Sequence, residues 1–286
     1  MKLMTLNTHS LAEASYEDPL RWFIRGVLAE TPDVIALQEV NQTRTAPVAG
    51  PALLQGYVPA QEHIPVRADN HAARVALGLR EGGVDCSWTY LPVKVGYGQY
   101  DEGLAVMTLN RAITRVESAL ISRAAAYDNW KTRRVLAVQA EGLPDVFCCV
   151  HMGWWADTQE PFAAQWAALR AWLGDRPQQA PVWLMGDFNA PAEVRGEGYD
   201  LVAGNGWYDT YCHARMRDAG ATADGGIDGW REGKGQGLRI DQIWCSQVVE
   251  VEESRVMFDG EHHPRVSDHR ALLITTPREH KKGSRA

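Results

Sequence analysis

Short apolar runs recur along this chain, and several of them follow one another with no helical segment between them. Adjacent antiparallel strands need only a turn between them, whereas parallel strands need a crossover that is usually a helix. The pattern therefore favours mixed β-sheets that pack on each other, with helices outside, over one purely parallel wound sheet. The predicted strands cover residues 2–7, 34–37, 73–79, 86–93, 103–109, 134–140, 146–151, 182–186, 238–245 and 271–275.

Two segments have helical periodicity instead. Asp18 and Pro19 resemble an N-cap followed by proline at the first helical position, and Pro32 ends the segment. Between them, apolar residues recur at spacings of three and four, which predicts an amphipathic helix: Leu20, Phe23, Ile24, Val27 and Leu28. A second helix is predicted over residues 159–173.

The chain of 286 residues contains no linker, internal repeat or low-complexity tract. We therefore predict one domain over residues 1–277 and a polar, basic tail over residues 278–286 that we expect to be disordered. The five cysteines include no CxxC pair, which is typical of reduced thiols. Because the sequence shows neither a signal peptide nor a transmembrane segment, we expect a cytoplasmic protein without membrane contact.

Six apolar segments end in polar residues that a buried strand does not need. A carboxylate, amide or imidazole appears at each of these ends: Asn7-Thr8-His9, Gln38-Glu39, His151, Gly186-Asp187-Phe188-Asn189, Asp241 and Ser267-Asp268-His269. A single such ending is more often a turn former or a helix cap. Six together favour convergence on one rim of a layered fold, where ligand sites lie.

These residue types supply the groups that hydrolysis of a phosphate ester requires. The ester is anionic, and a hard cation such as Mg²⁺, ligated by carboxylate and amide oxygens, neutralises it. The attacking water needs a base, and the developing oxyanion needs donors such as imidazole or an amide group. The sequence therefore predicts a metal-dependent phosphoester hydrolase.

In their order along the chain, these motifs resemble the endonuclease/exonuclease/phosphatase superfamily, also called DNase I-like. The resemblance covers nearly the whole chain, and its most specific elements are the segments 186–189 and 267–269. It implies an α/β (α+β) fold, a four-layer sandwich in which two mixed sheets pack face to face between outer helices. The expected cofactor is Mg²⁺, with Mn²⁺ as an alternative.

The resemblance also implies roles for the residues around the metal. Glu39 is the expected main ligand, with Asn7 and Asp268 nearby, directly or through water. Asp187 is expected to orient or deprotonate the attacking water, and Asn189 to hold a phosphate oxygen.

Two histidines complete the implied site. His269, paired with Asp241, is expected to contact the phosphate and to stabilise charge in the transition state. His151 is expected to be a second imidazole that faces the phosphate, and Glu102 matches the acidic residue that orients it.

Further stretches are similar to the branch of this superfamily that removes phosphate from maltose 6'-phosphate: residues 7–10, 100–103, 129–133, 151–155 and 191–199. A small phosphorylated sugar fits the net charge of −7, because a protein that grips nucleic acid usually shows a basic face. We therefore expect a phosphorylated sugar, and not nucleic acid, as the partner of the site.

Sugar faces stack on aromatic rings, and arginine binds phosphate through its fork of donors. The candidate substrate-binding residues are His9, Trp130, Lys131, Arg133, Trp154, Trp155, Asp228 and Trp230. Each has a structural alternative. Tryptophans also pack between layers, Lys131 and Arg133 could form a solvated strand face, and His9 and Asp228 could belong to turns.

Three other functions have distinct signatures. A nuclease or other phosphodiesterase of the same fold would carry a basic stripe, and a lipid phosphodiesterase of the sphingomyelinase branch would carry an apolar membrane-binding hairpin. A catalytically inactive binding module would show a gap in the metal and base residues. The sequence shows none of these features, and it carries no indication of the oligomeric state.

Overall fold

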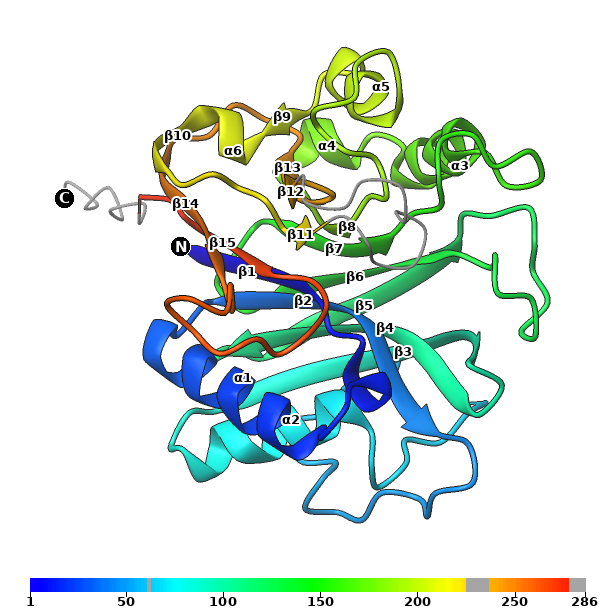
Figure 1. Ribbon diagram of the computed structural model, residues 1–286, viewed down its shortest axis with the longest axis vertical. Helices are drawn as coiled ribbons and strands as arrows, with labels where there is room; N and C mark the ends of the chain where they lie inside the picture. The colour runs from blue at the N-terminus through cyan, green and yellow to red at the C-terminus, as the bar shows by residue number, and fades with distance from the viewer. Residues whose placement is uncertain (61–62, 225–236, 278–286) are drawn as a thin grey trace, which may run out of the picture.

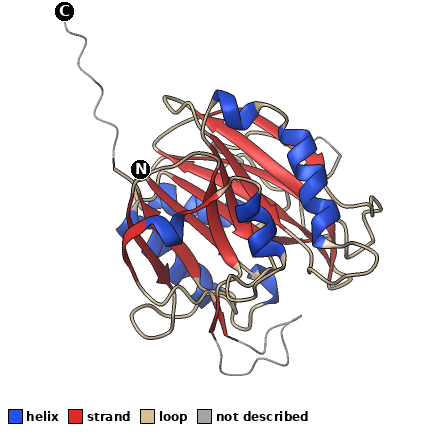
Figure 2. Ribbon diagram, turned by 90° about the horizontal axis from the view of Figure 1, so that it is seen from above, coloured by secondary structure: helices blue, strands red, loops and turns tan. Residues whose placement is uncertain are grey.

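The computed structural model describes residues 1–60, 63–224 and 237–277. Two large sheets lie one above the other, and helices cover their outer faces (Figure 1). The view from above shows the same helices along the outside of the sheets (Figure 2). The fold is therefore the four-layer α/β sandwich that the sequence predicts.

The larger sheet is mixed and contains the N-terminal strand. Its members are β1 (Lys2–Asn7), β2 (Val34–Thr43), β3 (Cys86–Gly96), β4 (Tyr100–Leu109), β10 (Ala214–Arg217), β14 (Val251–Met257) and β15 (Ala271–Thr275). The seven strands lie in the order β10-β14-β15-β1-β2-β4-β3. β1 runs parallel to β2, because helix α1 (Glu17–Glu30) crosses between them, and antiparallel to β15.

The second sheet is also mixed. Its members are β5 (Ile113–Leu120), β6 (Arg134–Ala140), β7 (Val146–His151), β8 (Val182–Asp187), β9 (Tyr208–Asp209) and β13 (Asp241–Cys245). The six strands lie in the order β5-β6-β7-β8-β13-β9. A separate short ladder joins β11 (Ala223–Asp224) to β12 (Gly237–Leu238).

Three apolar layers hold the sandwich together. One lies between the sheets and includes Val106, Phe147 and Trp183. A second packs α1 and α2 (His71–Glu81) against the larger sheet, and a third packs α3 (Phe162–Leu173) against the smaller one. The remaining helices are short: η1 (Ser10–Ala12), α4 (Arg176–Gln179), α5 (Gly198–Gly204) and α6 (Thr210–His213).

The strand predicted over residues 73–79 is wrong, because this segment lies within helix α2. Asn70 caps the helix by accepting a hydrogen bond from the N–H of Ala73 at 3.0 Å. The buried positions Ala72, Ala76 and Leu79 have helical spacing. A short apolar run does not by itself distinguish a strand from a buried helix.

The strand β5 was not predicted, because it is an edge strand with only Ile113 buried along its length. In contrast, β1, β6, β7 and β15 have the predicted bounds. Among the described residues, no helix is both long enough and apolar enough to cross a membrane. The predicted tail, residues 278–286, lies outside the described residues.

Candidate active site

The pairing of the strands brings their polar ends together. Asn7 at the end of β1 is paired with Gln38 of β2 in the larger sheet. In the smaller sheet, Asp187 at the end of β8 lies between His151 of β7 and Asp241 of β13. Because Asn7 donates to the Asp187 carboxylate at 3.2 Å, the ends of both sheets form one rim.

Glu39 reaches this rim through an irregularity in β2. The pairing of β2 with β4 shifts between Leu37 and Val40, so that the strand bulges at Gln38 and Glu39. Glu39 has a φ of +50°, a left-handed conformation that non-glycine residues rarely adopt. Bulges and strained residues of this kind re-aim side chains next to functional sites.

The segment after β1 braces the bulge. The Thr8 hydroxyl donates to the carbonyl of Gln38 at 2.8 Å, and the Ser10 hydroxyl donates to the carbonyl of Glu39 at 2.8 Å. Ser10 Oγ also accepts from the N–H of Asn41 at 3.0 Å. The polar sequence that follows β1 therefore satisfies the backbone groups that the bulge withdraws from the strand ladder.

Asp187 lies at the centre of the rim. One carboxylate oxygen, Oδ1, accepts from the N–H of Asn189 at 2.8 Å, and the other, Oδ2, accepts from Asn7. Nε2 of His151 lies 3.7 Å from Oδ2, and Nε2 of His269 lies 4.0 Å from it. Burial, together with the charge of Asp241, raises the pKa of Asp187 to about 7, in the range of a general base.

His269 is held by Asp241, as predicted. Its Nδ1 lies 2.8 Å from Asp241 Oδ2, so its Nε2 faces the site. Burial lowers the pKa of His269, but the charges of Asp241 and Asp187 outweigh that effect and raise the pKa to about 10. A positively charged imidazole at this position is suited to stabilise an anionic oxygen.

His151 has a different environment. Burial, together with the charges of Arg133 and Lys94, lowers its pKa well below the usual value, so the ring is neutral. The carboxylate of Glu102, expected to orient His151, forms an ion pair with Lys94 at 3.0 Å. Glu102 and His151 line the same small pocket. The carboxylate of Glu102 therefore lies near His151, but its ion-pair partner is Lys94.

The proposed metal ligands fit a hard cation. Asn7 Nδ2 donates to Glu39 Oε1 at 3.0 Å, and the amide oxygen of Asn7 accepts from the N–H of His9 at 3.3 Å. Burial raises the pKa of Glu39, and the nearby charges of Glu102 and Asp268 raise it further. A cation relieves this crowding of carboxylates, and carboxylate and amide oxygens are ligands that Mg²⁺ and Mn²⁺ accept.

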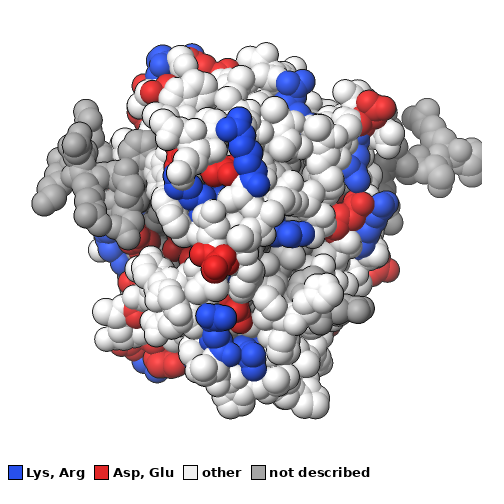
Figure 3. Space-filling model, turned by 90° about the vertical axis from the view of Figure 1, so that its right-hand side faces the viewer, with Lys and Arg blue, Asp and Glu red and all other residues white. Residues whose placement is uncertain are grey.

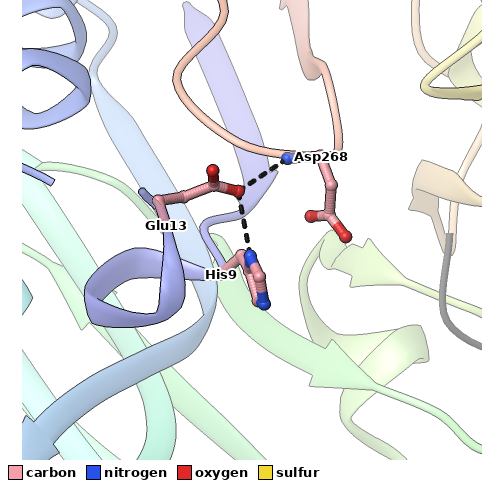
Figure 4. A group of neighbouring side chains, drawn as sticks. All are labelled: His9, Glu13 and Asp268. Atoms are coloured by element: carbon pink, nitrogen blue, oxygen red, sulfur yellow. Dashed lines mark hydrogen bonds and ion pairs between the residues drawn. The ribbon is translucent and has the colours of Figure 1, made fainter. Parts of the chain in front are cut away.

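Asp268 is linked to the end of β1 by a residue that sequence reasoning missed. Oε1 of Glu13 accepts from the N–H of Asp268 at 3.1 Å and lies 2.9 Å from His9 Nδ1 (Figure 4). Burial lowers the pKa of His9, but Glu13, Asp268 and Glu39 together raise it to about 9. His9 therefore lies beside the proposed metal ligands. On its solvent side, its Nε2 lies 3.0 Å from the hydroxyl of Tyr97.

The other predicted substrate residues do not all lie together. Trp130, which is 52% exposed, pairs with Trp154 at 5.8 Å between ring centroids. The Lys131 ammonium lies 5.2 Å from the centre of the Trp130 ring and forms an ion pair with Asp157 at 2.6 Å. These residues form a surface cluster near the pocket, whereas Arg133 is buried below them.

Trp155 packs against Phe162 of α3 at 6.3 Å between ring centroids, so it belongs to the helical side of the smaller sheet. Asp228 and Trp230 lie outside the described residues.

Lys94 is the second residue that sequence reasoning missed. It lies in β3 between Val93 and Val95 and is only 8% exposed. A lysine inside an apolar strand is the signal that would have indicated it, because lysine is almost never buried unless paired.

Together, these side chains can carry out metal-assisted hydrolysis. They place a base, Asp187, between a positively charged imidazole, His269, and a neutral one, His151, and next to a set of proposed oxygen ligands. The backbone N–H of Asn189 fixes that base, and the Asn189 side chain is tied to the carbonyl of Met152 at 3.0 Å.

Comparisons with known proteins agree with this geometry. The family model of the Endonuclease/Exonuclease/phosphatase family matches residues 4–269. An endonuclease/exonuclease/phosphatase family protein from Leptotrichia buccalis is 25% identical, with a TM-score of 0.83, over 97% of this chain and 100% of that chain. No curated protein matches.

Two further solved structures share the fold. A mannosyl-6-phosphatase from Bacteroides thetaiotaomicron has a TM-score of 0.67 and 16% identity, over 97% of this chain and 100% of that chain. A 3' phosphatase from Neisseria, solved with a product DNA hairpin, has a TM-score of 0.61 and 21% identity over the same shares.

Proposed function

This chain belongs to the endonuclease/exonuclease/phosphatase family, and we propose that it is a divalent-metal-dependent phosphomonoesterase for a small phosphorylated sugar, with maltose 6'-phosphate as the candidate substrate. Mg²⁺ is the proposed cofactor, and Mn²⁺ is the alternative. The observation that carries the proposal is the contact of Asp187 with Asn7, which joins the base to the proposed metal ligands.

The mechanism follows from the positions of the side chains. A divalent cation held by Glu39, with Asn7 and Asp268, would neutralise charge on the phosphate. Asp187 orients the attacking water and accepts its proton, because burial brings its pKa close to neutral pH.

The histidines act on the phosphate oxygens. His269, whose Nδ1 is fixed by Asp241, points Nε2 toward the site and stabilises the charge that develops on oxygen. His151, on the neighbouring strand β7, offers a neutral ring on the other side of Asp187.

Support for a sugar comes from the cluster of Trp130, Trp154 and Lys131. An exposed indole next to a second indole offers a platform for the CH face of a sugar. The carbonyl of Trp130 accepts from both Lys94 and Arg133, so the platform is joined to the cationic pocket beside His151. The mannosyl-6-phosphatase with the same fold acts on a sugar phosphate by name.

The distribution of charge argues against a long nucleic acid. On the face drawn in Figure 3, the described lysine and arginine side chains are scattered among acidic and uncharged residues. A protein that follows a phosphate backbone needs a basic stripe. The alternative is a nuclease or other phosphodiesterase of the same fold, and the substrate panel below tests it.

The test is release of product from a panel of substrates with Mg²⁺ present. The panel contains maltose 6'-phosphate, glucose 6-phosphate, a dinucleotide and plasmid DNA. We expect phosphate release from a sugar phosphate and intact plasmid. Cleavage of the dinucleotide or the plasmid without release from either sugar phosphate would replace the proposal by the alternative.

A further inference from the structure

Two cationic side chains, Lys94 and Arg133, are buried side by side in the wall of the site. Lys94 comes from β3, is 8% exposed, and Arg133 precedes β6 and is 4% exposed. Both line a small pocket with Glu102 of β4, Thr132 and His151. The pocket therefore joins the larger sheet to the smaller one next to a proposed phosphate-facing imidazole.

The positive charge of Lys94 is balanced by a carboxylate within the protein. Its ammonium forms the ion pair with Glu102 at 3.0 Å and donates to the carbonyl of Trp130 at 3.1 Å. These partners hold the ammonium in place, so a buried lysine is tolerated here.

Arg133 is compensated less directly, because the carboxylates of Glu102, Glu39, Asp187 and Asp157 act on it without forming a direct ion pair among the described residues. Its Nη1 donates to the carbonyls of Trp130 at 3.0 Å and Thr132 at 3.3 Å, but no described carboxylate forms an ion pair with it. Its Nε is buried without a hydrogen-bond partner. A buried guanidinium without a direct ion pair, and with one N–H unbonded, is costly, so this side chain is placed to receive an anion.

The anion would lie next to the reacting groups. His151 lines the pocket together with Arg133, and its Nε2 lies 3.7 Å from the carboxylate of Asp187, so only His151 separates the pocket from the proposed base. The charge of Arg133 also lowers the pKa of His151. An anion in this pocket would therefore lie beside the proposed phosphate-facing imidazole.

We propose that Arg133, supported by the Lys94–Glu102 ion pair, binds a terminal phosphate oxygen and makes the site prefer monoesters to diesters. This inference rests on the proposed function and identifies the residues that select its substrate class. A monoester has one more ionisable oxygen than a diester and one substituent fewer. Charge-assisted hydrogen bonds from a guanidinium favour the doubly charged phosphoryl group of a monoester.

The test compares two small substrates, p-nitrophenyl phosphate and bis(p-nitrophenyl) phosphate, with Mg²⁺ present. For Arg133→Gln and Lys94→Met, we expect kcat/KM for the monoester to fall by about tenfold to a hundredfold, the range of a lost charge-assisted hydrogen bond. We expect kcat/KM for the diester to change by less than about threefold, since it lacks the extra charge. Equal losses on both substrates would overturn the inference.

A matched control is Lys2→Met, since Lys2 also pairs with a glutamate, Glu30, at 3.1 Å and donates to a backbone carbonyl. It lies at the opposite end of β1 from Asn7 and should leave both substrates unaffected. The substitution Lys94→Met leaves the Glu102 carboxylate without its ion-pair partner. The double variant Lys94→Met/Glu102→Gln is therefore also measured, and circular dichroism checks that each variant is folded.

Binding of inorganic phosphate, measured by calorimetry with no substrate, separates this inference from the proposed function. Weaker phosphate binding by Arg133→Gln than by Lys2→Met supports the pocket even if no sugar phosphate is turned over. Unchanged phosphate affinity in Arg133→Gln would contradict the pocket even if the wild-type protein is an active phosphatase.

Discussion

At the scale of single residues, the site depends on how Asp187 and His269 are held. Asp187 is fixed by the N–H of Asn189 and by Asn7, and His269 is fixed by Asp241. Neither side chain contributes mainly by filling apolar space. Their replacement should therefore affect chemistry far more than folding.

We predict that Asp187→Asn and His269→Ala each lower kcat by at least about a hundredfold, because each removes charge or proton transfer from the reaction. The measurement is steady-state phosphate release by purified variants whose circular dichroism matches the wild type. His262→Ala is the control, since His262 is exposed and pairs only locally with Asp259. Near-normal turnover by either site variant would refute the assigned roles.

A second prediction concerns His71, a buried residue of α2 on the helical side of the larger sheet, whose Nδ1 lies 2.9 Å from the hydroxyl of Tyr16. Burial, together with the charge of Arg74, lowers its pKa to about 3. The unfolded chain therefore binds a proton that the folded protein does not, between about pH 3 and the ordinary value of about 6.5. Stability is complete above that range and falls as the pH drops through it.

In His71→Phe, this contribution is absent. We expect the free energy of unfolding of the wild type to fall faster than that of His71→Phe below pH 6.5, with a difference in slope of up to about 1.4 kcal/mol per pH unit. Urea unfolding at several pH values between 5 and 7.5 measures both slopes. Parallel curves would show that His71 titrates normally in the folded protein.

The sequence could indicate these candidate residues because their motifs are local, but it could not predict all their partners. Asp187 and Asn189 are two positions apart, whereas the Lys94–Glu102 pair forms across the register of β3 and β4. Glu13 was missed because its contact with Asp268 joins positions more than 250 residues apart. Such contacts follow from the tertiary fold and leave no local pattern.

At the scale of elements, the bulge in β2 decides where Glu39 points. The sequence predicted β2 only as far as Leu37, because the apolar run ends there. The strand continues to Thr43 with buried polar residues. The segment after β1 bonds the backbone of Glu39 and Asn41, whereas the Gln42 side chain donates to Asp101 and to the carbonyl of Pro65. A polar strand end can therefore be the middle of a strand that serves a site.

We predict that Ser10→Ala lowers the free energy of unfolding by about 1–3 kcal/mol, because the carbonyl of Glu39 and the N–H of Asn41 lose their partner. It should also weaken Mn²⁺ binding, measured by calorimetry, since Glu39 loses its brace. Ser118→Ala on the edge strand β5 is the matched control for the substitution itself. Wild-type stability and Mn²⁺ affinity in Ser10→Ala would show that the brace is dispensable.

At the scale of the whole molecule, the site exists only where the two sheets meet. The larger sheet and its loops contribute the proposed metal ligands Asn7, Glu39 and Asp268. The smaller sheet contributes Asp187, His151 and Asp241. The motif order predicted the family and its layers, whereas the helix α2 and the edge strands β5, β9 and β10 needed the packed structure. The account as a whole therefore predicts that a cation ligated from the larger sheet serves a base from the smaller one.

Chelation and metal add-back test that claim most directly. Phosphate release from the best sugar phosphate is measured before EDTA treatment, after exhaustive chelation, and after addition of Mg²⁺ or Mn²⁺. We predict loss of activity to the level of Asp187→Asn on chelation and recovery when either metal is added. Full activity in the chelated protein would contradict the account, because the carboxylates around Glu39 would then have another purpose.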